Sequence, residues 1–257
     1  GREISGDVMI VSLGVDFAPE LIPGLLEAGR NIYTLNGAES IHRDLISFSG
    51  GKIVVLTAAP AYKCPAAPYE AAMLVEDFCR KHGIREKTQI DIYAAEPGPM
   101  LTAGPELSAA VRKMIESKGI SYHPNHQITS VDAKAHTLIF SSGDKAAFDL
   151  LFYVPPHKAP EVVKQAGLVS ESGWVSVDRN TLETKFRGVY AIGDVTAIPL
   201  KMGKPLPKAG VFAHRQAETV AHNIAVEWLE SAQRRSFDGF GECFIEIGDH
   251  RAGMGSG

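Results

Sequence analysis

Cys64 is the residue of this chain with the strongest signal for chemistry. It follows Lys63 and comes shortly before a predicted helix that Glu70 opens. A neighbouring cation and the positive end of a helix dipole both favour a thiolate, which is a nucleophile and a redox group. Glu70 would then accept a proton near the thiol. The competing interpretations are an inert, packed cysteine and an acid that only stabilises the helix.

A second group of residues suits the binding of a large cofactor. Residues 189–192 are predicted to form a short buried strand that Gly193 ends, and Asp194 follows at once. Further on, the loop 207–210 opens the longest predicted helix, which ends at Leu229. The acid offers a carboxylate to sugar-like hydroxyls, and the helix start offers free N–H groups to an anion. A simple strand-ending turn is the alternative interpretation of the Gly-Asp pair.

The remaining candidates are one histidine and two further cysteines. His157 follows a Pro-Pro pair at the end of a predicted strand, where α/β proteins bind ligands, so it is a catalytic candidate. Cys79 and Cys243 are predicted to be packing residues. The cysteines form no CxxC pair, and His123 and His126 have no carboxylate or cysteine beside them, so no metal site is predicted.

Composition removes several classes of protein. The chain has 257 residues, of which 45% are hydrophobic and 22% charged, with a formal net charge of -4. These values are typical of a folded globular protein, and without a basic stripe a nucleic-acid partner is not expected. The longest apolar run is far shorter than the ~18 residues that a membrane span needs.

The hydrophobic pattern predicts an α/β fold with a parallel sheet. Strands at 52–58 and 89–95 alternate with helices at 68–82 and 107–118, as in a right-handed βαβ unit. A β-hairpin follows at 128–141. Apolar strands at 8–14 and 148–154 frame this block, and the first is expected to be covered on both faces. Two nested doubly wound, Rossmann-like domains are therefore expected.

The predicted boundaries follow from this nesting. Residues 1–43 and 158–230 are assigned to a first domain, 44–157 to an inserted Rossmann-type domain, and 231–257 to the start of a C-terminal domain. The chain begins without Met and stops in a Gly-rich loop, so a fragment trimmed at both ends is expected.

The first strand-to-helix loop of the inserted domain is unsuited to a dinucleotide. Residues 59–70 contain no glycine and several prolines, whereas a nucleotide-binding βαβ unit needs G-x-G-x-x-G there. Proline removes N–H donors and fixes φ. We therefore expect that NADH is a poor reductant of this protein.

Three motifs together resemble a known family. They are Cys64-Pro65-Ala66-Ala67-Pro68-Tyr69-Glu70, Tyr190-Ala191-Ile192-Gly193-Asp194 and Pro207-Lys208-Ala209-Gly210. They look like the sulfide:quinone oxidoreductases, and are similar to the flavoprotein subunit of flavocytochrome c sulfide dehydrogenase. Both belong to the FAD-dependent pyridine nucleotide-disulfide oxidoreductase superfamily. The resemblance covers essentially the whole chain.

The resemblance implies FAD as cofactor. It places Asp194 on the ribityl chain and Cys64 beside the flavin as a redox cysteine. The residues it implies for cofactor binding are Leu13, Gly14, Gly193, Asp194, Val195, Lys208, Ala209 and Gly210. The glycine motif that grips the ADP half of FAD is absent from this chain. A second redox cysteine is expected between the Gly-Asp and Pro-Lys-x-Gly motifs, but residues 196–206 contain none.

The implied activity is an oxidoreductase reaction. Electrons would pass from sulfide or another small sulfur species, through the Cys64 thiolate and FAD, to a quinone or cytochrome. The alternatives are an NAD(P)H-dependent FAD oxidoreductase similar to type II NADH dehydrogenase, and a redox-silent relative that serves as a binding partner. Members of the quinone type attach to membranes through a C-terminal segment. A cytoplasmic or peripheral membrane protein is therefore implied, and a periplasmic location stays open.

Overall fold

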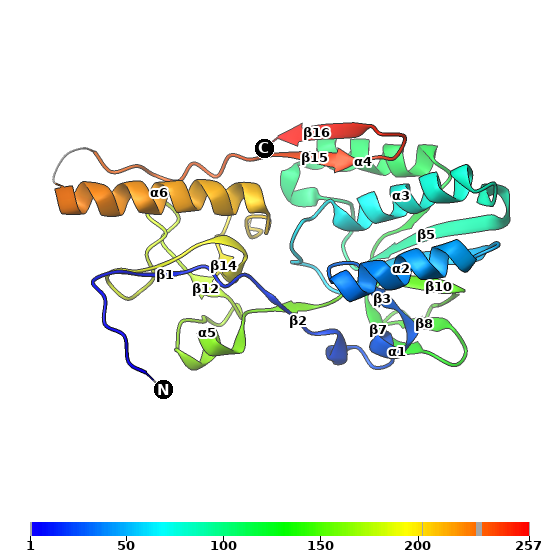
Figure 1. Cartoon of the computed structure of the whole chain (residues 1–257), viewed down its shortest axis with the longest axis horizontal. Helices are drawn as coiled ribbons and strands as arrows, with labels where there is room; N and C mark the ends of the chain where they lie inside the picture. Colours follow the sequence, from blue (N-terminus) through cyan, green and yellow to red (C-terminus); the bar gives the residue numbers. More distant parts are fainter. Residues whose placement is uncertain (1, 202, 230–232, 257) are drawn as a thin grey trace. The chain divides into compact units, whose positions relative to one another are not determined.

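The computed structural model describes residues 2–201, 203–229 and 233–256 (Figure 1). The chain divides into two compact units. The first comprises Gly1–Asp16 and His157–Glu242, and the second Phe17–Pro156 and Cys243–Gly257. These divisions fall at other positions than the predicted domain boundaries, which stay a prediction.

The second unit is built on a five-stranded parallel sheet. Its order is β3 (Arg30–Asn31), β10 (Leu150–Val154), β4 (Gly51–Thr57), β5 (Thr88–Ala94) and β6 (Ser121–His123). Every pairing in it is parallel, which confirms the predicted fold class. Residues 53–56 of the central strand β4 are fully buried, because layers cover both faces of the sheet.

Helices cover one face of this sheet and a small antiparallel sheet covers the other (Figure 1). The helices are α2 (Leu35–Ser47), α3 (Ala67–Lys81) and α4 (Pro105–Ser117). On the other face lie α1 (Leu25–Ala28) and the antiparallel strands β7 (Ile128–Asp132), β8 (Thr137–Phe140) and β9 (Lys145–Ala147). The third strand extends the predicted hairpin into a meander.

A two-stranded sheet completes the second unit. It consists of β15 (Glu242–Glu246) and β16 (Ala252–Ser256). Ile245 of β15 is 2% exposed and joins the core cluster that α3 and α4 form with the parallel sheet. This contact brings the late segment of the chain onto the helical layer.

The first unit has shorter strands and one long helix. β1 (Met9–Val11) pairs with β13 (Val189–Ala191), and β12 (Val175–Ser176) pairs with β14 (Thr196–Ala197), both in parallel. The helices are α5 (Glu161–Gln165), the 3₁₀ turn η4 (Gly193–Val195) and α6 (Gly210–Leu229). The short strands β2 (Asp16–Phe17) and β11 (His157–Lys158) stand where the chain passes between the units. No helix in the described ranges is long and apolar enough to cross a membrane.

The prediction that the first strand is covered on both faces is wrong. Met9 is 54% exposed and Ile10 46% exposed, although Val11 is buried. Within the described residues β1 pairs with β13 in a sheet of two strands, which leaves the other edge of β1 open. An apolar sequence favours burial, but only neighbouring elements provide it.

Candidate functional site

Two glycines mark the carboxyl edge of the small sheet in the first unit. β1 and β13 run in parallel with Val11 beside Ala191, and the amide of Ile192 donates to the Val11 carbonyl at 3.0 Å. Gly14 and Gly193 follow the two strands with φ of 65° and 73°, values that favour glycine. No described atom lies within 4 Å of where a Cβ on Gly14 would stand. This edge is where α/β proteins bind ligands.

Hydrogen bonds fix the turn that presents Asp194. The Gly193 amide donates to Oε1 of the buried Gln216 at 2.6 Å, and the Thr196 hydroxyl donates to the Gly193 carbonyl at 2.8 Å. The Val195 side chain is fully buried in the apolar core. A ligand at this edge would therefore meet the partly exposed Asp194 side chain and only the backbone of Val195.

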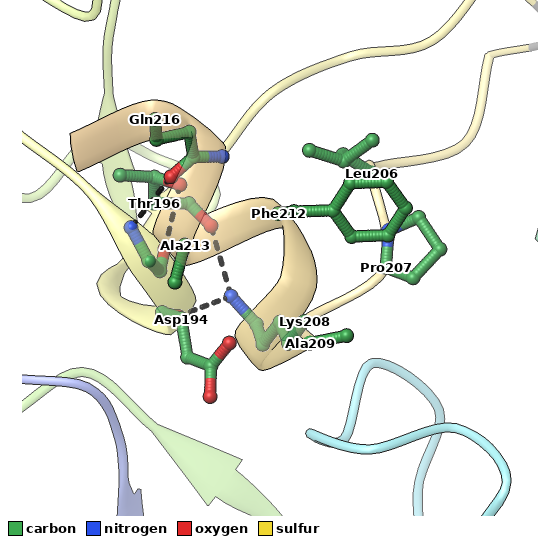
Figure 2. Close-up of a pocket in the computed structure, with 10 residues that line it drawn as sticks. Asp194, Thr196, Leu206, Pro207, Lys208, Ala209, Phe212, Ala213 and Gln216 are labelled. Carbon is green, nitrogen blue, oxygen red and sulfur yellow. Dashed lines mark hydrogen bonds between the residues drawn. The ribbon is translucent and has the colours of Figure 1, made fainter. Parts of the chain in front are cut away.

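Lys208 connects this turn to the start of α6 (Figure 2). Its buried ammonium donates to the Asp194 carbonyl at 2.6 Å and the Thr196 carbonyl at 2.9 Å, and lies 3.5 Å from the ring centroid of Trp174. The side chain is thus engaged within the protein. The neighbouring Ala209 and Gly210 carry little or no side chain at the start of α6, the kind of helix end where proteins bind anions.

Burial of Lys208 predicts a pH-dependent stability. Desolvation lowers its pKa to about 8, and the nearby Asp194 carboxylate opposes the shift. Because the unfolded chain then binds more protons between pH ~8 and ~10, the free energy of unfolding should rise across that window. The thermal midpoint of the full-length protein should therefore gain from this group as the pH rises. Lys208→Met should remove that rise, while Lys204→Met, at an exposed position of the same loop, should keep it. Equal pH slopes in all three proteins would contradict the assignment.

The loop that carries Cys64 lies in the second unit, between β4 and α3. Cys64 is exposed and has a φ of 48°, and Ala61 has a φ of 67°. The Tyr33 hydroxyl donates to the carbonyl of Lys63. The Lys63 ammonium lies 5.1 Å and 5.5 Å from the ring centroids of Phe17 and Tyr33. The Lys63 ammonium is therefore in cation–π contact with both rings.

The local charges that favour a thiolate at Cys64 are outweighed by other effects on its pKa. Partial desolvation raises the pKa of the solvent-accessible thiol, and the Glu70 carboxylate raises it further. The amides of Ala67 and Ala66 at the start of α3 lower it, as the helix-dipole argument predicts, but they do not outweigh the other two effects. Glu70 therefore acts on Cys64 as a nearby negative charge.

Cys243 lies on β15, a strand that contacts Glu70, which the sequence did not indicate. On β15 it shares a face with the buried Ile245, opposite Phe244, which is 70% exposed. The Glu246 amide of the same strand donates to Glu70 Oε1 at 2.9 Å. The Glu70 carboxylate raises the pKa of both thiols, after desolvation, and Cys243 also contributes to the shift of Cys64. Both cysteines are free thiols.

The other candidates lie elsewhere. Cys79 is fully buried in the core, which confirms its predicted packing role. His157 is half-buried at the start of β11 and belongs to the first unit, whereas Cys64 and Glu70 belong to the second. The described residues contain no group of three or more His, Cys, Asp or Glu side chains that could hold a metal.

The chain belongs to the pyridine nucleotide-disulphide oxidoreductase family, whose model matches residues 1–219. Among its relatives, the mitochondrial sulfide:quinone oxidoreductase of Dictyostelium discoideum is 27% identical over 256 residues, covering 95% of this chain and 55% of that protein. The Mus musculus protein of the same name is 26% identical, covering 98% and 57%. The chain thus spans about half the length of these relatives.

Two further comparisons bear on fold and activity. The structure of the sulfide:quinone oxidoreductase from Aquifex aeolicus superposes with a TM-score of 0.80 at 19% identity, covering all of this chain and 66% of that one. At this identity the likeness shows the fold. A type II NADH:quinone oxidoreductase of Haemophilus influenzae is 28% identical over 193 residues, covering 73% of this chain and 43% of that protein.

Proposed function

We propose that the chain is part of an FAD-dependent oxidoreductase of the sulfide:quinone type. The observation that carries the proposal is that Cys64, Cys243 and Glu70 lie in one unit, where β15, the strand of Cys243, is hydrogen-bonded to Glu70, although Cys243 lies far from the other two in sequence. Sulfur chemistry uses two thiols, and a carboxylate beside them suits proton transfer. The names of the two sulfide:quinone oxidoreductase relatives agree with this assignment.

The first unit fits the cofactor that the family implies. Open space at Gly14, the Asp194 carboxylate and the start of α6 together offer what a ribityl chain and an electron-rich ring edge need. When bound, FAD would supply a two-electron acceptor. Leu13, Gly193, Val195, Lys208 and Ala209 shape this edge, mainly through backbone atoms and, for Lys208, by holding the Asp194 turn.

In the second unit the cysteines would handle the sulfur substrate. Hydrosulfide would attack a Cys64–Cys243 disulfide, leaving one cysteine as a persulfide and the other as a thiolate. Glu70 would accept the proton that the substrate or thiol releases. Each sulfide oxidised yields two electrons, and the names of the relatives favour a quinone over a cytochrome as the final acceptor.

The competing function is reduction by NADH, which the similarity to a type II NADH:quinone oxidoreductase suggests. The loop of the second unit argues against it. It lacks the glycines that a pyrophosphate requires. It carries Tyr62 and Tyr69 instead, whose hydroxyls donate hydrogen bonds to the Glu96 carboxylate.

A titration of the full-length protein separates these functions. Anaerobic addition of sulfide should bleach the flavin absorbance within the turnover time, whereas an equal concentration of NADH should leave it unchanged for far longer. Rapid bleaching by NADH alone would favour the competing function. A folded full-length protein without flavin absorbance would indicate a redox-silent relative.

A further inference from the structure

Glu96 collects three side-chain hydrogen bonds just beyond the end of β5. The hydroxyls of Tyr62 and Tyr69 donate to its Oε1 at 2.6 Å and 2.9 Å, and the Thr57 hydroxyl donates to Oε2 at 2.8 Å. All three donors are buried, with exposures of 8%, 0% and 0%. Both oxygens of the carboxylate are therefore committed to donors within the protein.

The two tyrosines enclose the Cys64 loop. Tyr62 precedes Cys64 by two residues, and Tyr69 lies in the first turns of α3. Between them the chain adopts a left-handed conformation at Cys64, and Ala61 does so just before Tyr62. Such conformations are unfavourable for non-glycine residues and persist only where surrounding contacts impose them. One carboxylate that binds both ends of the segment is such a contact.

Glu96 stands where dinucleotide-binding domains carry an acid that binds the cofactor. In dinucleotide-binding domains of this topology an acid near the end of the second strand binds a ribose hydroxyl. Glu96 follows the second strand of the βαβ unit, but here tyrosine and threonine hydroxyls take the place of the ribose. The carboxylate thus binds side chains at both ends of the loop where such domains carry the glycine motif.

We propose that Glu96 is a positioning residue, which holds the Cys64 loop through Tyr62 and Tyr69 and so sets the thiol beside Glu70 and Cys243. This inference rests on the proposed function for its catalytic consequence. Hydrogen bonds to a charged acceptor are about twice as strong as neutral ones, which suits a contact that must offset backbone strain. Burial and the Glu96 charge raise the pKa of both tyrosines well above the ordinary value, so both remain donors at neutral pH.

The test measures alkylation of Cys64 in the full-length protein. Iodoacetamide labelling across pH 6–10, read by peptide mass spectrometry, gives the rate and pH midpoint of each cysteine separately. In Glu96→Gln and Tyr62→Phe the Cys64 loop should become more mobile, and the Cys64 thiol should move away from the Glu70 carboxylate. The Cys64 midpoint should then fall toward the free-thiol value, and its rate at pH 7.5 should rise about threefold or more. Cys79, in the core, should be unaffected.

Tyr153→Phe is the matched control, because it removes the hydroxyl of a buried tyrosine of the same unit, on β10, that is not a donor to Glu96. It should leave the Cys64 profile unchanged. If Glu96→Gln fails to fold, Tyr62→Phe decides, since it keeps the ring and removes one donor. A wild-type Cys64 rate and midpoint in the folded variants would overturn the proposal.

The same variants separate this inference from the proposed function. Alkylation needs no sulfide, flavin or quinone, so a shifted Cys64 profile supports the positioning role even if sulfide fails to bleach the wild-type flavin. Where sulfide does bleach it, both variants should slow the bleaching by about tenfold or more, because small misplacements of a reacting group are costly. Slowed bleaching with an unchanged Cys64 profile would count against the positioning role.

Discussion

Cys64→Ser in the full-length protein is expected to slow sulfide-dependent bleaching of the flavin by at least about a thousandfold, the scale on which removal of a nucleophile acts in other enzymes. Serine keeps the size and the exposed position of the side chain but cannot form a disulfide or persulfide. The measurement is the rate of flavin bleaching in anaerobic stopped-flow experiments at a fixed sulfide concentration.

The control for this variant is Cys79→Ala. It removes the fully buried thiol of α3, the helix that follows the Cys64 loop. The bleaching rate should stay within about twofold of wild type. Flavin content must be equal in all samples, because cofactor loss would imitate a catalytic defect. Undiminished bleaching in Cys64→Ser would exclude a role for this cysteine.

Cys243→Ser is expected to cause a loss of similar size. If the two thiols act as one disulfide unit, the double variant Cys64→Ser/Cys243→Ser should be no slower than either single variant, as is found for groups that work together. Peptide mapping of the oxidised wild-type protein without reductant should also recover the two cysteines in one linked peptide. An additive loss in the double variant would show that the thiols act independently.

Phe244→Ala provides the matched control on the same strand. Phe244 lies next to Cys243 but points to the opposite, exposed side of β15. Its removal tests whether disturbance of the strand alone slows bleaching, and near-wild-type rates are expected. If Cys243→Ser were as active as Phe244→Ala, Cys64 would have to work without this partner.

Local sequence patterns predicted most of the second unit. The β-branched run in β4 and the helical spacing in α3 and α4 depend on neighbours a few residues apart, so their elements were found within about two residues. The strand-end position of Gly193-Asp194 and the missing glycines after β4 were equally readable, because turn chemistry is local. The exposure of Met9 could not be predicted from local sequence, since it depends on which strands lie beside β1.

The sequence by itself determined the fold class and the family, and it predicted Cys64 and Glu70 as candidate site residues. Only the tertiary structure decided that Cys243 is their neighbour, that Lys63 rests on two aromatic rings, and that the pKa of Cys64 is raised. The physical reason is that desolvation and charge act through space. Their sum at one sulfur atom comes from α3 and β15 together, segments that the chain brings side by side only when it folds.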